Sequence, residues 1–430
     1  MKIVDLFCGA GGFSQGFRMA GHEVLGGVDI DPDACATYAL NFPGAKTICG
    51  DLRNLEAREQ ATALAKDADI IIGGPPCQSF SQVRNHDRLL DDPRNILYRE
   101  YVRVLEVAQP LAFVMENVPG LSQMRVQERV ARELSLNGTY EVKAQIVDAC
   151  DFGVPQTRQR IVFLAVHKSL GIRPPELRGT WTSSLINLER RMNGYGAQYQ
   201  LVGDRIHIAR ALEELGDPER LGLVSVEQAL SDLAHLRAGS RHDEIRVEGL
   251  PPARSAYQRL ARQNVSPVLK NVSVPRINRD TALRLDSIPP GGNYLDLPLD
   301  LQERYITGEK WGPHNGTGML ARRHYYAYRR LHPAIWAWTL NTKADSAYHW
   351  KECRALSVRE FARLQSFPDS FIFTTSPGKG NLPGRIDGGP AHSRYRQVGN
   401  AVPPLLAKAV AEAVVQALAD TGVVAVRKTA

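Results

Sequence analysis

The chain has 430 residues, of which 43% are hydrophobic and 23% charged, and its formal net charge is +7. These values are ordinary for a soluble globular protein of two or three domains. The six cysteines are scattered without a CxxC pair, which argues against a zinc site or a disulfide framework and fits a reducing cytoplasm. We expect no signal peptide, because the N-terminal residues 1–7 have the pattern of a strand that runs directly into a glycine loop. We expect no membrane-spanning segment, because no apolar run approaches the roughly 18 residues required. The positive charge is compatible with a nucleic-acid partner but does not establish one.

Residues 1–170 alternate short apolar runs with amphipathic stretches. The apolar runs predict strands at 2–7, 22–29, 68–73, 110–116, 140–148 and 160–166. The amphipathic stretches predict helices near 12–20, 32–41, 54–66, 96–108 and 126–136. This alternation is typical of an α/β fold with a Rossmann-like, doubly wound, mostly parallel sheet. Because residues 149–159 have little helical character, we expect the last two strands to form a hairpin, with the final strand antiparallel.

The pattern changes between about residues 175 and 345, where Arg, Pro, Gly and aromatic residues become frequent and the strand–helix alternation fades. We interpret this stretch as a second, smaller domain. Regular pattern returns near residue 356, where Ser357 and Glu360 have the spacing of a helix capping box. A final apolar helix is expected from Pro403 to about Ala419. The predicted division is therefore 1–174, 175–345 and a return segment at 346–430.

A glycine-rich loop, DLFCGAGGFS at 5–14, follows the first strand. Glycines here (Gly9, Gly11, Gly12) would let the backbone approach a ligand closely. The dinucleotide fingerprint requires glycine where Ser14 stands, which disfavours a nicotinamide or flavin enzyme. Asp29 lies 18 residues after Gly11, the spacing at which an acidic side chain reaches ribose hydroxyls.

A third acidic residue, Asp51, lies where the next strand should end and where a carboxylate could meet an adenine edge. These features indicate a nucleoside ligand without a required pyrophosphate, and S-adenosylmethionine fits that description. The alternative is an acidic loop that only caps helices.

The most informative single residue is Cys77, in the run GGPPCQSFS at 73–81. Two glycines and two prolines force an abrupt turn directly after a buried strand. The turn predicts a thiol presented at the edge of the sheet where α/β proteins place their chemistry. The alternative is a core cysteine that follows a loop.

Three further groups are expected at this edge. Glu116 ends one strand, and Arg158 and Arg160 lie in the predicted hairpin. Together with a thiol they match the methylation of a pyrimidine at carbon 5, which requires thiolate attack on carbon 6 to make carbon 5 nucleophilic. Glu116 would serve ring nitrogen 3, and Arg160 would meet the charge that develops on the carbonyl oxygen. The alternatives are a helix cap or ion pair for Glu116 and surface charges for the arginines.

In their order and spacing these motifs resemble the DNA (cytosine-5) methyltransferases, of the restriction–modification type. The resemblance covers residues 1–166 and 353–418. It is carried by the loop at 5–12, Pro76-Cys77, Glu-Asn-Val at 116–118, Gln-x-Arg-x-Arg at 156–160, Arg-Glu-x-x-Arg-Leu-Gln-x-Phe-Pro at 359–368 and Gln-x-Gly-Asn-Ala-Val at 397–402.

The resemblance implies a class I methyltransferase fold in which the final helix packs beside the first strand. It implies that S-adenosylmethionine contacts Phe7, Gly11, Asp29, Ile30, Asp51, Leu52, Pro76 and Leu97, with Asn400 and Val402 completing the pocket. It places Gln78, Ser79 and Ser81 in a loop that closes on a flipped base. The chain departs from its relatives at 335–340, IWAWTL, which puts the packing and DNA contacts there in doubt.

The resemblance also makes the long central region the target-recognition domain. Its residues 301–330 carry six Lys/Arg against two acids. We expect the arginines Arg322, Arg323, Arg329 and Arg330 to contact DNA, although a solvated basic face is the alternative. A separate DNA-gripping domain would supply the energy for flipping the base.

The leading hypothesis is therefore a sequence-specific, S-adenosylmethionine-dependent DNA cytosine-5 methyltransferase that forms a covalent Cys77 adduct. The expected partners are double-stranded DNA and a cognate restriction endonuclease, and the chain is expected to act as a cytoplasmic, nucleoid-associated monomer without a metal. Two alternatives remain. One is the tRNA-methylating branch of the family, which has a short central region; the other is a non-catalytic DNA-binding relative.

Overall fold

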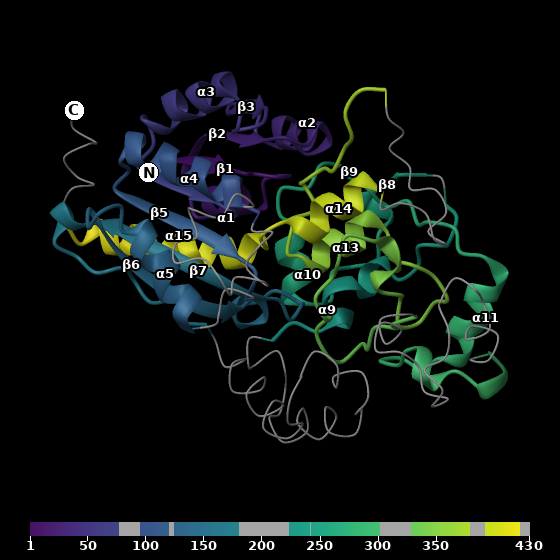
Figure 1. Ribbon diagram of the computed structural model, residues 1–430. Coiled ribbons are helices and arrows are strands. Elements are labelled where there is room, and N and C mark those ends of the chain that lie inside the picture. Colours follow the sequence, from purple (N-terminus) through teal and green to yellow (C-terminus); the bar gives the residue numbers. More distant parts are fainter. Residues whose placement is uncertain are drawn as a thin grey trace.

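The computed structural model describes residues 1–76, 95–119, 124–179, 223–240, 242–301, 328–378 and 392–421 (Figure 1). Within these residues, seven strands form one sheet in the order β3-β2-β1-β4-β5-β7-β6. The strands are β1 (Lys2–Leu6), β2 (Glu23–Asp29), β3 (Lys46–Cys49), β4 (Ile70–Gly73), β5 (Ala112–Asn117), β6 (Tyr140–Asp148) and β7 (Gln159–His167).

The first five strands are parallel, whereas β7 is antiparallel to both β5 and β6. The predicted sheet and its antiparallel final strand are confirmed. The sequence predicted the end of a strand near Asp51 but gave no bounds for β3, because its four residues, KTIC, contain only one buried side chain, Ile48. The register between β5 and β7 places Glu116 opposite Val162. The loop that precedes β7 therefore lies at the edge where β5 ends.

Helices cover both faces of the sheet because successive strand residues point to opposite sides. Val4 and Leu6 of β1 join the core under α3, α4 and α5, whereas Ile3 joins the core under α1 and the last helix. The helices of this part are α1 (Gly12–Met19), α2 (Pro32–Asn41), α3 (Leu55–Ala65), α4 (Ile96–Ala108) and α5 (Met124–Leu134). All five correspond to predicted helices.

The C-terminal part of the chain returns to the sheet. Helix α13 (Val358–Leu364) begins with the predicted capping box between Ser357 and Glu360. It is followed by α14 (Ser393–Asn400) and α15 (Pro404–Ala419), and α15 packs along α1 (Figure 1). The final helix thus lies on the face covered by α1 and shares a core with Ile3 of the first strand.

Within the described residues, the helical stretch Ser393–Ala419 is long and apolar enough to pass a length-and-composition test for a membrane span. This finding is weak evidence for a membrane-spanning helix, because buried core helices have the same length and composition. Half of the apolar window is buried, and the stretch is interrupted between α14 and α15.

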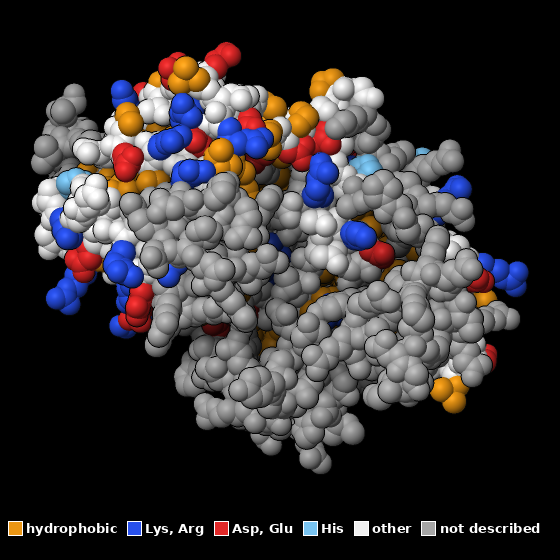
Figure 2. Space-filling view, in the orientation of Figure 1, with side chains coloured by type: hydrophobic (Ala, Val, Ile, Leu, Met, Phe, Trp, Pro, Cys, Tyr) orange, Lys and Arg blue, Asp and Glu red, His pale blue; other side chains and the backbone are white. Residues whose placement is uncertain are grey.

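The remaining elements lie beside the sheet, on the right in Figure 1. They are α9 (Val226–Leu230), β8 (Glu244–Arg246), α10 (Ala256–Ala261), β9 (Val268–Lys270) and α11 (Arg279–Ser287). A shared apolar core joins α9, α10 and α13 to Tyr38 of α2 and to Phe42, the residue that follows α2. In Figure 2, Lys and Arg side chains on the described part of the visible face are interspersed with acidic ones and form no single basic patch there.

Candidate active site

A cavity of about 550 Å³ lies at the carboxyl ends of β1 to β5. Its walls come from the loop after β1, the ends of β2 and β3, the turn after β4, the end of β5, and residues 396–402 of the return segment. This is the edge where parallel α/β sheets bind their ligands. Its volume is suited to a molecule of nucleoside size.

The glycine loop after β1 is fixed to the end of β2. The Gly9 amide donates a hydrogen bond to Asp29 Oδ2 at 2.8 Å, and the Asp31 amide donates to Asp29 Oδ1 at 2.9 Å. Burial raises the pKa of the Asp29 carboxyl, and these hydrogen bonds oppose the rise. A Cβ atom added at Gly9 would meet nothing within 4 Å, so the backbone there faces open space.

Two of the predicted cofactor glycines, Gly11 and Gly12, are not among the residues that line the cavity, and both have a role in packing. Gly11 has a φ of 96°, and a Cβ atom there would lie 2.5 Å from the Phe42 ring. At Gly12 an added Cβ atom would lie 2.3 Å from the Val402 carbonyl oxygen. Glycine is therefore required at both positions so that α2 and the return segment can approach the loop.

The other predicted cofactor residues all line the cavity: Phe7, Gly9, Asp29, Ile30, Asp51, Leu52, Pro76, Leu97, Asn400 and Val402. Ile30 leaves 60% of its surface exposed beside the cavity, whereas Leu52 is buried. Asp51 accepts a hydrogen bond from Arg53 Nε at 2.8 Å, which holds the pKa of its carboxyl below the usual value. The cavity thus combines carboxylates with apolar surface.

Glu116 and Arg160 meet directly in the cavity. Arg160 Nε lies 2.6 Å from Glu116 Oε1, and both side chains are nearly buried. A Cβ atom at Gly74 would lie 3.3 Å from Glu116 Oε2, so the small residue after β4 leaves room for the carboxylate. The structure brings together an acid and a guanidinium that are 44 positions apart in the sequence, as predicted from their places at the strand ends.

Arg158 also lines the cavity, but its guanidinium is tied to the backbone. Its Nη1 donates to the Leu340 carbonyl at 3.2 Å, and its Nη2 donates to the Gly399 carbonyl at 2.6 Å. Burial and the neighbouring Arg160 lower the pKa of Arg158, and Glu116 opposes the shift. Its contacts therefore differ from those of Arg160, which faces Glu116.

Two residues that shape this site, Asn117 and Arg396, were not among the site residues predicted from the sequence. Asn117 donates from Nδ2 to the Pro75 carbonyl at 3.0 Å and so ties the turn after β4 to the end of β5. Its place next to Glu116 in the Glu-Asn-Val motif was the available signal. Arg396 lines the cavity and pairs with Asp31 at 2.8 Å, a contact between residues too distant in sequence to be inferred.

The predicted DNA-contacting residues have different outcomes. Those that lie outside the described residues are Gln78, Ser79, Ser81, Arg322 and Arg323, together with the catalytic candidate Cys77. Arg329 is buried with its guanidinium 4.4 Å from the Trp338 ring centroid.

Arg330 requires a correction. It is buried, and its guanidinium donates to the carbonyls of Leu285, Ile288, His349 and Lys351. Because four backbone carbonyls occupy its donors, Arg330 holds the central region together, and the expectation of a DNA contact is not supported.

The sheet order with an antiparallel seventh strand, and a nucleoside-sized cavity at its carboxyl edge, define a class I methyltransferase fold. A family model described as "C-5 cytosine-specific DNA methylase" matches residues 1–416. The chain therefore belongs to this family and is a DNA (cytosine-5-)-methyltransferase.

Two curated relatives match along nearly the whole chain. The Type II methyltransferase M1.HphI of Haemophilus parahaemolyticus is 32% identical over 97% of this chain and 87% of its own length. The Type II methyltransferase M.DdeI of Desulfomicrobium norvegicum is 32% identical over 96% of this chain and 88% of its own length.

A solved structure supports the fold. It is described as a prophage-encoded DNA modification methyltransferase (E. coli), with a TM-score of 0.65 and 24% identity. The match covers 97% of this chain and 99% of that one.

Proposed function

We propose that the protein transfers a methyl group from S-adenosylmethionine to carbon 5 of a flipped cytosine in a specific double-stranded DNA sequence, through a covalent adduct with Cys77. The observation that carries the proposal is the Glu116–Arg160 ion pair inside the cavity that Asp29 and Asp51 also line. Membership of the cytosine-specific family supplies the substrate class.

The residues present fit S-adenosylmethionine. Asp29 is half-buried and held by backbone amides, which suits ribose hydroxyls, and Asp51 offers a carboxylate to an adenine amino group. Ile30 and Leu52 supply apolar surface for the base, and the open space beside Gly9 leaves room for the ligand. When bound, S-adenosylmethionine supplies an electrophilic methyl group on a sulfonium.

The chain's own residues activate the cytosine. The Cys77 thiolate adds to carbon 6, and the electron pair of the ring double bond shifts so that carbon 5 becomes nucleophilic. Glu116 holds a proton at ring nitrogen 3 as this occurs, and Arg160, paired with Glu116 at 2.6 Å, stabilises charge on the carbonyl oxygen. Carbon 5 takes the methyl group, which leaves S-adenosylhomocysteine. A water molecule then accepts the carbon 5 proton, the C–H electron pair re-forms the ring double bond, and the bond between carbon 6 and the Cys77 sulfur breaks to release the thiolate.

Two features prepare the turn that presents Cys77. The Pro75 carbonyl is held by Asn117, and Pro76 lines the cavity immediately before the cysteine. The thiol itself lies outside the described residues, so its assignment rests on its position after Pro76. A fixed turn at this point lowers the entropic cost of placing a nucleophile against the base.

We further propose the division into a catalytic part, residues 1–174 and 346–430, and a target-recognition part, residues 175–345. The packing of α15 on α1 supports the first assignment. The length of the central region supports the second. By analogy with relatives named Type II methyltransferases, the protein would act on cytoplasmic nucleoid DNA as a monomer, alongside a cognate restriction endonuclease.

The deciding experiment measures transfer of labelled methyl from S-adenosylmethionine to unmethylated genomic DNA, with bulk tRNA as a parallel substrate. We expect label in DNA, and we expect the Cys77→Ser variant to lose it while retaining DNA binding. Label only in tRNA would assign the chain to the RNA-modifying branch. Label in neither substrate would favour a non-catalytic DNA-binding protein.

A further inference from the structure

The loop that carries the two active-site arginines is paired with a segment from the central region. The Ala337 amide donates to the Pro155 carbonyl at 2.9 Å, and the Thr157 amide donates to the Ala337 carbonyl at 2.8 Å. The Leu340 amide then donates to the Gln156 side chain at 3.0 Å. The position of this loop therefore depends on contacts far from it in the sequence.

Two fully buried glutamines extend this contact to the cofactor side of the cavity. Gln156 Nε2 donates to Gln365 Oε1 at 2.6 Å and to the Leu364 carbonyl at 3.0 Å. Gln365 Nε2 donates in turn to the Ala401 carbonyl at 2.6 Å. A flipped amide at either residue would direct an oxygen against a carbonyl oxygen, so this arrangement is the one that satisfies both side chains.

The wall at 399–402 is consequently fixed on both sides of Asn400. Gln365 holds the Ala401 carbonyl, and Arg158 holds the Gly399 carbonyl at 2.6 Å. Gly399 permits a further close approach, because a Cβ atom there would lie 2.2 Å from the Asn341 carbonyl oxygen. The segment with Asn400 and Val402 and the loop with Arg160 are thereby held in one arrangement.

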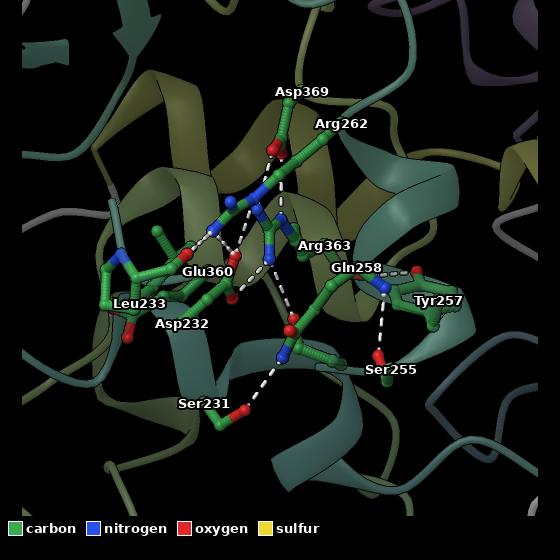
Figure 3. Close-up of polar contacts among 12 residues, drawn as sticks. Ser231, Asp232, Leu233, Ser255, Tyr257, Gln258, Arg262, Glu360, Arg363 and Asp369 are labelled. Carbon is green, nitrogen blue, oxygen red and sulfur yellow. Dashed lines mark hydrogen bonds and ion pairs between the residues drawn. The ribbon is translucent and has the colours of Figure 1, made fainter. Parts of the chain in front are cut away.

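Gln365 directly follows α13, and a network of charged side chains surrounds the end of this helix. Figure 3 shows Arg363, Asp232, Asp369 and Arg262 of this network. Arg363 is fully buried and pairs with Asp232 at 2.7 Å and with Asp369 at 2.6 Å. Arg262 of the central region pairs with the same Asp232. These contacts fix the last turn of α13 against the central region, immediately before Gln365.

We propose that Gln365 and Gln156 are positioning residues for methyl transfer, which fix the cofactor wall at Asn400–Val402 relative to the Glu116–Arg160 pair. The inference rests on the proposed function. It assigns no contact with substrate to either glutamine. Both act through the segments that they join, and Arg158 supports the same wall through Gly399.

The test uses Gln365→Met, which preserves volume and removes the amide. We expect kcat/KM for methylation of unmethylated genomic DNA to fall about 10- to 100-fold, because a small misplacement of reacting groups has effects of this size. Affinity for S-adenosylhomocysteine, measured by calorimetry, should fall by a smaller factor of roughly 3 to 10. This binding measurement reports on the wall without requiring turnover.

The matched control is Gln258→Met. Gln258 is equally buried, donates to Ser231 Oγ at 2.8 Å and accepts from the Arg254 amide at 2.8 Å, and does not line the cavity (Figure 3). We expect it to lower the melting temperature as much as Gln365→Met while leaving kcat/KM and S-adenosylhomocysteine affinity within about twofold of wild type.

A double variant separates positioning from general destabilisation. If the two amides act as one unit, the double variant Gln156→Met with Gln365→Met should have the same kcat/KM as the less active single variant. If they act independently, its loss of kcat/KM should equal the product of the two single losses. Equal activity of Gln365→Met and Gln258→Met, or multiplicative losses in the double variant, would overturn the inference. An inactive wild-type protein would instead refute the proposed function, so the two failures are distinguishable.

Discussion

Arg160 Nε lies 2.6 Å from Glu116 Oε1. Glu116 lies at the end of β5, and Arg160 is the second residue of the neighbouring strand β7. Both side chains are nearly buried, so each fixes the other's orientation inside the cavity. A carboxyl group that exchanges a hydrogen bond or a proton with a nucleobase must point toward it, and an ion-pair partner such as Arg160 holds the carboxyl group in one orientation. The first prediction tests this pair.

The variant Glu116→Gln should lower the methylation rate by about 10²- to 10⁴-fold, because it removes a group that can exchange a proton with ring nitrogen 3. Protein stability should fall far less than activity, since the amide can still accept a hydrogen bond from Arg160. The measurement is the single-turnover rate of methyl transfer to genomic DNA, together with the melting temperature.

A matched control for this variant is Glu100→Gln. Glu100 is a buried carboxylate on α4 that pairs with Arg58 at 2.9 Å and with Arg103 at 2.6 Å, and it does not line the cavity. It should lose stability without losing the rate per folded molecule. Comparable rates for the two variants would contradict an active-site role for Glu116.

The second prediction concerns the close approach at Gly12. An added Cβ atom would lie 2.3 Å from the Val402 carbonyl oxygen and 3.1 Å from Phe367, so Gly12→Ala must displace the return segment from the loop after β1. We expect weaker binding of S-adenosylhomocysteine by roughly tenfold or more, and a loss of stability of about 1–3 kcal/mol. Calorimetry and thermal unfolding measure the two effects.

Gly44→Ala provides the comparison, because a Cβ atom there would meet nothing within 4 Å. It should leave binding unchanged. If Gly12→Ala behaved in the same way, the return segment would not be held against the loop as described.

The third prediction separates structural arginines from DNA-contacting ones. Arg330→Met should reduce the free energy of unfolding by about 2–4 kcal/mol, because the carbonyls of Leu285, Ile288, His349 and Lys351 would lose their buried donors. The dependence of DNA affinity on salt should keep its wild-type slope. A stable variant whose slope falls by about one would instead mean that Arg330 neutralises a phosphate.

The contrast between Arg160 and Arg330 shows what the sequence could predict. Strand ends at one edge of a parallel sheet follow from local hydrophobic runs and from chirality, so the meeting of Glu116 and Arg160 could be inferred. Arg330 lies in a run rich in basic residues that resembles a phosphate-binding stretch. Its burial depends on carbonyls 19 to 45 positions away, which no local pattern encodes.

The same limit applies to residues that join distant segments. Gln156 and Gln365 are 209 positions apart, and Arg158 reaches a carbonyl 241 positions away. The motifs marked these residues, but only the folded chain shows that they bond to each other rather than to a ligand. Gly11 and Gly12 were recognised as glycines that allow close approach, yet the approaching group is protein.

The last prediction follows from Asp5, a fully buried carboxyl in the wall of the cavity. Its Oδ2 accepts hydrogen bonds from Ser14 Oγ at 2.7 Å and from the Ser14 amide at 3.2 Å. Burial raises the pKa of Asp5 from 3.8 to about 7, the Ser14 hydrogen bonds oppose the rise, and the nearby Asp29 adds to it.

Between about pH 4 and pH 7 the folded protein keeps the Asp5 proton that the unfolded chain has released. Folding is therefore favoured at the lower pH, and this contribution is lost as pH rises through about 7. Asp5→Asn has no such proton, so its stability relative to wild type should increase with pH over this window, by up to about 1.4 kcal/mol per pH unit, and level off above it.

Urea unfolding of both proteins at a series of pH values between 5 and 9 measures the difference. Ser14→Ala removes the hydroxyl donor that lowers the pKa of Asp5. When Asp5→Asn is compared with its parent in a Ser14→Ala background, the stability difference should therefore stop increasing at a higher pH. A stability difference between Asp5→Asn and wild type that stays constant across the series would show that Asp5 is ionised in the folded protein. In that case its charge would be available to the sulfonium-bearing ligand at neutral pH, and Asp5→Asn should weaken binding of S-adenosylmethionine more than binding of the uncharged-sulfur product S-adenosylhomocysteine.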